Sequence, residues 1–160
     1  DAKNVFFETS SRKKFSSVEE KSRFYSNYLG LYIERASEYC LVLVDGQGIC
    51  GYIVGALDTS NCYMSSNPYY SLFKTYLHDY PSHLHINILP RAQGSGQGRE
   101  LLKSFMQKLK MHKSSGVHII TSPTAENVKF YLACGFTYNK VETYQKNELM
   151  FMGKSLISGT

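Results

Sequence analysis

A chain of 160 residues, 42% of them apolar and 19% charged, has the size and composition of one folded domain, which excludes a disordered or fibrous protein. No stretch approaches the roughly 18 consecutive apolar residues of a membrane helix, and no signal-peptide pattern opens the sequence. Eighteen basic against thirteen acidic residues give a formal net charge of +5, which favours anionic partners. The basic residues form no long run, so nucleic acid is not indicated as a partner.

The cysteines bear on metals and on location. Cys40, Cys50, Cys62 and Cys134 show no C-x-x-C spacing, and no histidine cluster has zinc spacing. We therefore expect no metal site and four free thiols, as in a reducing compartment, with a cytoplasmic or nucleocytoplasmic location. Residues 1–160 are interpreted as a single domain that could be the C-terminal fragment of a longer chain, because the sequence begins with Asp rather than Met.

In the first half of the chain, residues 1–15 are predicted to be irregular. Ser17 and Glu20 form a capping-box pattern ahead of apolar positions at helical spacing, which predicts a helix over 17–36. The runs EYCLVLV and ICGYIVGAL flank DGQG, which predicts a β-hairpin. The tyrosine-rich stretch 59–82 is predicted to contain one short helix.

The second half begins with a predicted strand, HLHINILP, that Pro90 closes. A glycine loop follows, and then a helix to about residue 112 and a strand GVHIIT. Ser122 or Thr124 could cap the next helix, which Gly135 ends, and FTYNKVE and ELMFMGKSL are predicted to be the last strands. This order of elements predicts a mixed α/β sheet.

The glycine loop, ILPRAQGSGQGRELL, has three possible uses. A nucleotide-triphosphate P-loop needs G-K-[ST], but Gly98 is followed by Arg99 and Glu100. A dinucleotide fingerprint needs G-x-G-x-x-G and an acid after the next strand, and this sequence has neither. The remaining use is an anion cradle, in which backbone amides at a helix N-terminus hold a pyrophosphate. A tight turn without a ligand is the alternative.

The loop resembles the acetyl-coenzyme A loop of the Gcn5-related N-acetyltransferases (GNAT), whose pattern is Q/R-x-x-G-x-G/A after a strand ending V-x-P. Gln93, Gly96 and Gly98 fall on that pattern. FYLACGF, residues 130–136, resembles the second motif of the same superfamily. One predicted helix and one predicted strand separate the two motifs, as in that superfamily.

The resemblance implies an α/β GNAT fold with a mixed central sheet that is splayed at the cofactor strand and flanked by helices. It implies acetyl-CoA as the cofactor, with its pantetheine along the strand, its thioester oxygen at the Ile88 amide and its pyrophosphate on the loop. The implied cofactor-binding residues are Ile88, Leu89, Gln93, Gly94, Ser95, Gly96, Gln97, Gly98, Arg99 and Thr124.

The resemblance also suggests catalytic residues. Tyr131 matches the tyrosine that protonates the leaving thiolate, although it could equally be an ordinary packed aromatic. Asn87 stands where related bacterial acetyltransferase-like domains carry Asp. Its side chain is an amide, which cannot take a proton from the amine. Replacement bases are His85 on the same strand face, His118 or Asp58, although histidines in strands are commonly structural and Asp58 could cap a turn. Thr124 stands where the family usually has Asn.

A narrower resemblance, over roughly residues 40–156, is to the C-terminal histone-acetyltransferase-like domain of O-GlcNAcase and its bacterial relatives. Two functions stay open. The first is an N-acetyltransferase of weak or no activity toward a small amine or protein-lysine acceptor, with residues 59–82 walling the acceptor site. The second is a catalytically idle pseudo-acetyltransferase domain, serving as an interaction or structural module with a glycoside hydrolase upstream. The chain itself shows no carboxylate pair suggestive of glycosidase chemistry.

Overall fold

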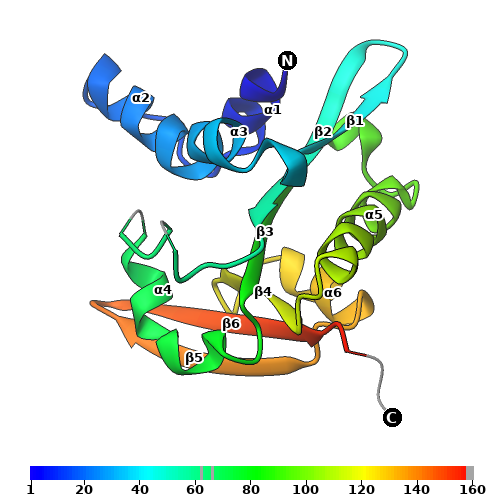
Figure 1. Ribbon diagram of the computed structural model, residues 1–160. Helices are drawn as coiled ribbons and strands as arrows, with labels where there is room; N and C mark the ends of the chain where they lie inside the picture. The colour runs from blue at the N-terminus through cyan, green and yellow to red at the C-terminus, as the bar shows by residue number, and fades with distance from the viewer. Residues whose placement is uncertain (62, 66, 158–160) are drawn as a thin grey trace. The chain divides into compact units, whose positions relative to one another are not determined.

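The structure is a computed structural model that describes residues 1–61, 63–65 and 67–157 (Figure 1). It forms two compact units: residues 1–56 with 85–107, and residues 57–84 with the chain from 108 onward. Strand β3 (Ser82–Ile88) and helix α5 (Gln97–Met111) contribute residues to both units. The six strands follow the order β1-β2-β3-β4-β6-β5, with β3 and β4 parallel, which confirms the predicted mixed α/β sheet. The prediction of a single domain stays a prediction.

The first unit opens with helices that are coloured blue in Figure 1. The prediction of an irregular segment over residues 1–15 is wrong, because α1 (Ala2–Thr9) is a helix that Asp1 caps by accepting a hydrogen bond from the Asn4 amide at 3.1 Å. Its driving force is the burial of Val5 and Phe6, which are 1% and 4% exposed. Two buried residues in so short a segment give little periodicity to detect.

The predicted helix over 17–36 is present but not uniform. It comprises α2 (Val18–Tyr25), a π-helical turn η1 (Ser26–Gly30) and α3 (Leu31–Arg35), and a 3-10 turn η2 (Ser37–Tyr39) follows. A π turn holds one more residue than an α turn, so it changes which side chains share a face. The π turn was not predicted.

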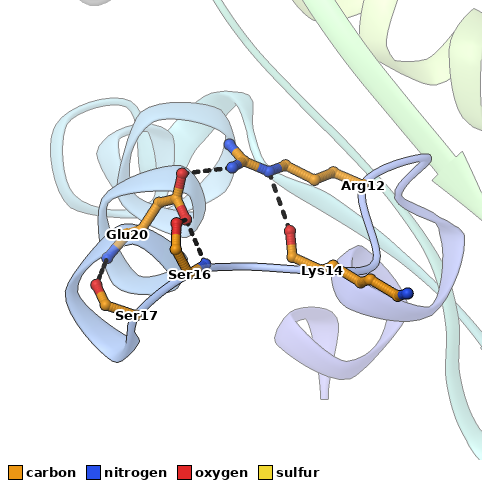
Figure 2. A network of polar contacts seen from close by, with 5 residues as sticks. All are labelled: Arg12, Lys14, Ser16, Ser17 and Glu20. Atoms are coloured by element: carbon orange, nitrogen blue, oxygen red, sulfur yellow. Dashed lines mark hydrogen bonds and ion pairs between the residues drawn. The ribbon is translucent and has the colours of Figure 1, made fainter.

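Figure 2 shows the start of α2, where Ser17 caps the helix as predicted but the Glu20 side chain bonds to Ser16 and not to the Ser17 amide, so half of the predicted capping box forms. Ser17 Oγ accepts a hydrogen bond from the Glu20 amide at 3.1 Å. The Glu20 carboxylate accepts from the amide and hydroxyl of Ser16, both at 2.6 Å, and also pairs with Arg12. These hydrogen bonds, above all the one from the Ser16 hydroxyl, lower the pKa of Glu20 from 4.5 to about 2. The capping interaction is therefore strongest when Glu20 is ionised.

The predicted hairpin consists of β1 (Leu41–Asp45) and β2 (Gly48–Ala56), which pair antiparallel with an irregularity between Leu43 and Val44. Gly48 has a positive φ of 111° at the turn. A residue with a side chain would be strained there.

The second unit contains α4 (Pro68–Leu72), a 3-10 turn η3 (Lys74–Leu77), β4 (Gly116–Thr121), α6 (Asn127–Ala133), β5 (Tyr138–Tyr144) and β6 (Asn147–Ser155). Strand β6 pairs antiparallel with both β4 and β5. Helix α6 begins at Asn127, so neither Ser122 nor Thr124 caps it as expected; instead the Ser122 hydroxyl accepts a hydrogen bond from the Thr124 amide at 3.4 Å. Gly135 does end that helix, with a φ of 87°.

No helix in the described part of the chain is long and apolar enough to cross a membrane. Cys40, Cys50 and Cys134 form no disulfide, whereas Cys62 lies outside the described residues.

Candidate cofactor and acceptor site

The glycine loop leads from β3 into the N-terminus of the 15-residue helix α5. Gly94 and Gly96 have positive φ values of 79° and 83°, a conformation that favours glycine. Apart from chain neighbours, no atom of the described residues lies within 4 Å of where a Cβ would stand at either position. The loop is therefore glycine-rich for its backbone conformation and not for close packing within the chain. The backbone is open to a ligand.

The start of the loop is braced from three sides. The Gln93 side-chain amide donates to the Ile88 carbonyl at 2.7 Å, and the Leu89 amide donates to the Cys50 carbonyl at 2.8 Å. The Arg91 guanidinium, in the 3-10 turn η4 (Pro90–Ala92), donates to both carboxylate oxygens of Asp45 at 2.9 and 3.3 Å. Preorganised amides bind an anion without a further ordering cost. The brace thus suits a loop that cradles phosphate.

The end of the loop is the N-terminus of α5. The amides of Arg99 and Glu100 donate to the Gly96 carbonyl at 3.0 and 3.2 Å. Helical geometry directs the amides of Gln97 and Gly98, in the first turn, out of the helix end. These amides and the helix dipole attract an anion, so the loop fits the pyrophosphate of acetyl-CoA. Ser95 lies between the two positive-φ glycines, and its hydroxyl donates to the Ala92 carbonyl at 3.3 Å.

Strand β3 places its polar side chains on one face just before the loop. Alternation puts His85 and Asn87 on the same face, and the peptide groups of Ile88 and Leu89 point toward opposite strand edges. Because the Leu89 amide is bonded to Cys50, the Ile88 amide points toward the edge away from β2. In the parallel ladder of β3 with β4, Ser82 pairs with Val117 and His83 with His118.

His85 and Asn87 are each hydrogen-bonded to a tyrosine. The Asn87 amide nitrogen donates to the Tyr52 hydroxyl at 2.9 Å, and the Tyr32 hydroxyl lies 3.1 Å from His85 Nε2. Desolvation by burial lowers the pKa of His85 to about 4, so the imidazole is neutral at pH 7. Desolvation likewise raises the pKa of Tyr52. At neutral pH the side chains of His85, Asn87 and Tyr52 therefore carry no charge.

The other predicted residues lie in the second unit. Tyr131, on α6, is 5% exposed, and burial raises the pKa of its phenol, which stays protonated at neutral pH. Its ring contacts Phe136 edge-on at 5.3 Å. His118 is fully buried, and its Nδ1 donates to the Tyr80 carbonyl oxygen at 2.7 Å. Its ring stacks on Phe151 at 4.7 Å, which is a structural role.

Asp58 caps a turn, which is one of the two roles that the sequence suggested for it. Its carboxylate accepts from the amide and hydroxyl of Ser60 at 2.8 and 2.6 Å. Thr124 is exposed, and its hydroxyl lies 3.0 Å from that of Ser122. Among the described residues, no three His, Cys, Asp or Glu side chains are grouped so as to hold a metal ion.

The sequence did not predict the pairing of Arg91 with Asp45 or the role of the tyrosines. Asp45 and Arg91 are 46 positions apart, and no local pattern joins them. Tyr28 and Tyr32 lie within the predicted helix over 17–36, and their spacing on one helix side could have indicated a shared face.

Comparison with known proteins now identifies the class. Residues 36–138 match the family described as the acetyltransferase (GNAT) domain, so the chain belongs to that family. The fold is similar to that of SsHAT, at a TM-score of 0.75 and 20% identity over 98% of this chain and 93% of that one. Naa20 of Chaetomium thermophilum, solved with a bisubstrate analogue, matches at a TM-score of 0.66 and 19% identity over 95% of this chain and 80% of that one.

A third similar structure bears on the cofactor. The protein yncA of Salmonella typhimurium, solved with its cofactor acetyl-CoA, matches at a TM-score of 0.60 and 14% identity over 98% of this chain and 87% of that one. The α/β GNAT fold predicted from the sequence is confirmed. The family and this neighbour are consistent with acetyl-CoA as the cofactor.

Proposed function

We propose that this domain binds acetyl-CoA and transfers its acetyl group to a primary amine. The observation that carries the proposal is the open glycine loop, braced at its start by Gln93 and Arg91 and ending at the N-terminus of α5. Amides of residues 94–98 hold the pyrophosphate, and Arg99 adds a positive charge in the first helical turn. The Ile88 amide, on the strand edge away from β2, is positioned as a donor to the thioester oxygen.

The cofactor supplies an activated acetyl thioester: when an ammonium is acetylated, a C–N bond replaces the C–S bond, and a thiol and one proton are released. Tyr131 is the proposed donor to the departing sulfur, because it falls on the family's second motif, FYLACGF, and its phenol is protonated at neutral pH. Asn87 cannot take the amine's proton, but its amide can orient the amine. His85 is neutral at pH 7, but burial lowers its pKa to about 4, which makes it a weak base, so it is proposed to orient the amine while the proton leaves to solvent.

The test is thiol release from acetyl-CoA with a panel of amines, together with mass detection of the acetylated amine. Amine-dependent release with an acetylated product supports the transferase. Cofactor binding without release from any amine would instead support the idle domain related to the O-GlcNAcase module, and the transferase proposal would fail.

A further inference from the structure

Tyr28 lies in the π turn η1 and Tyr32 in the following helix α3, and the rings of both contact His85 of β3. The Tyr28 ring lies 6.1 Å from the His85 ring, and the Tyr32 ring lies 5.4 Å from it. π turns inside helices are frequent at functional sites, because the extra residue re-aims the side chains around it. Here the re-aimed rings meet the strand face that leads directly into the cofactor loop.

The side chains on this face of β3 and the N-terminal helices are partly exposed, and buried tyrosines hold two of them. Tyr25, Tyr28, His85 and Asn87 are half-buried, so part of each can be reached from solvent. Tyr32 and Tyr52 behind them are each 1% exposed and hold His85 and Asn87 by hydrogen bonds. We call the four half-buried residues the tyrosine face. Its side chains are aromatic or neutral hydrogen-bonding groups, and none is a carboxylate.

Aromatic rings in this unit already hold cations. The Lys3 ammonium lies 4.9 Å from the centre of the Tyr25 ring, within the tyrosine face itself. The Lys21 ammonium lies 4.6 Å from the Phe7 ring, and the Arg12 guanidinium lies 4.9 Å from the Phe15 ring. The Arg12 guanidinium also lies 5.8 Å from the Phe24 ring. Such contacts occur about once per 70–80 residues in proteins, so the four within residues 3–25 show that aromatic rings of this region repeatedly bind single cationic groups.

The overall charge limits which amines can approach. With a formal net charge of +5, the chain repels a polycation more strongly than a singly charged amine. A basic peptide or polyamine would also need carboxylates, which the tyrosine face does not supply. An aromatic amine can stack its ring on a tyrosine ring and place its one ammonium over another.

We infer that the tyrosine face binds the acetyl acceptor, and that this acceptor is a primary monoamine on an aromatic body rather than a polyamine or a lysine-rich peptide. The inference rests on the proposed function, because it assigns the second substrate of that reaction. Tyr28 supplies the ring that holds the amine, and Asn87 and His85 orient its nitrogen.

The test compares 2-phenylethylamine, spermidine and a lysine-rich peptide by kcat/KM for thiol release and by saturation-transfer NMR with the protein. We expect kcat/KM for 2-phenylethylamine to exceed that for spermidine by at least about tenfold. Tyr28→Leu, which keeps a bulky apolar side chain without a ring, should lower it by about 2- to 30-fold, the range of one cation–π contact. Tyr28→Phe, which keeps the ring, should lower kcat/KM for 2-phenylethylamine less than Tyr28→Leu does. Tyr144→Leu, a half-buried tyrosine on β5, is the matched control.

Equal or better use of spermidine or of the peptide would overturn the inference, as would equal losses in Tyr28→Leu and Tyr28→Phe. Acetyl-CoA binding, measured separately by calorimetry, keeps the two proposals apart. If acetyl-CoA binds but no amine gives thiol release or saturation transfer, the acceptor inference fails and cofactor binding stands. If acetyl-CoA does not bind but 2-phenylethylamine shows saturation transfer that Tyr28→Leu removes, the proposed function fails and the amine site stands.

Discussion

Replacing Gly96 with Val should abolish tight acetyl-CoA binding and leave the domain folded. Gly96 has a φ of 83°, and a side chain there strains the backbone by about 1–2 kcal/mol. For a domain of this size, 1 kcal/mol lowers the melting temperature by roughly 2–4 °C, so we expect a fall of about 2–8 °C. The native fold thus survives, but the loop must leave its path, and its amides no longer converge on the pyrophosphate.

The effect on binding is larger than the effect on stability. A hydrogen bond to a charged group contributes about 1.5–3 kcal/mol, so losing a single amide contact raises the Kd by roughly 10- to 150-fold. The assay is isothermal calorimetry with acetyl-CoA, accompanied by thermal unfolding of the same samples. Gln145→Val is the control, because Gln145 also has a positive φ, of 55°, is exposed, and lies between β5 and β6 in the second unit. It should lower the melting temperature and leave the Kd unchanged.

Two results would refute this reasoning. If Gly96→Val binds acetyl-CoA as tightly as the unchanged protein, the loop is a structural turn and not an anion cradle. If Gln145→Val weakens binding as much as Gly96→Val, the loss reflects general destabilisation and says nothing about the loop.

Three further predictions concern Tyr131, the second unit and pH. Tyr131→Phe should lower turnover by roughly 10²-fold or more while the acetyl-CoA Kd stays the same, and unchanged turnover would remove Tyr131 from the chemistry. Gly116→Ala should lower the melting temperature by about 2–12 °C, because its Cβ would stand 2.5 Å from the Asp79 carbonyl oxygen. Gly46→Ala, where no described atom lies within 4 Å of the added Cβ, should leave the melting temperature unchanged. Equal melting temperatures of the two variants would contradict this packing. Glu20 has a lowered pKa in the fold, so its stabilising effect should be complete above about pH 4.5 and be lost as the pH falls toward about 2. Thermal unfolding of Glu20→Gln over that range should show a smaller pH dependence, and an identical pH profile would count against the network.

Local patterns predicted the cofactor loop, and contacts between distant parts of the chain decided the rest of the site. The glycines at 94 and 96 indicate a positive-φ backbone within a few residues. Gln93 donates to the Ile88 carbonyl only five positions away. The pairing of Arg91 with Asp45 depends on the hairpin meeting the loop, which no local pattern contains.

The tyrosine face shows why side-chain contacts were harder to predict than the glycine loop. Strand alternation placed His85 and Asn87 on one face, but it could not say what lies opposite them. The π turn shifts Tyr28 and Tyr32 relative to a uniform helix, so a 3.6-residue period does not predict their contacts with His85. Likewise, Asp58 and His118 were candidate bases by residue type, and only their partners reveal a turn cap and a core histidine.

The most direct test of the central claim is an NMR titration of the ¹⁵N-labelled protein with acetyl-CoA, following each backbone amide. The account predicts saturable shifts that are largest at the amides of residues 94–98, with a further shift at Ile88. No shifts at millimolar acetyl-CoA, or shifts confined to residues outside the loop, would contradict it.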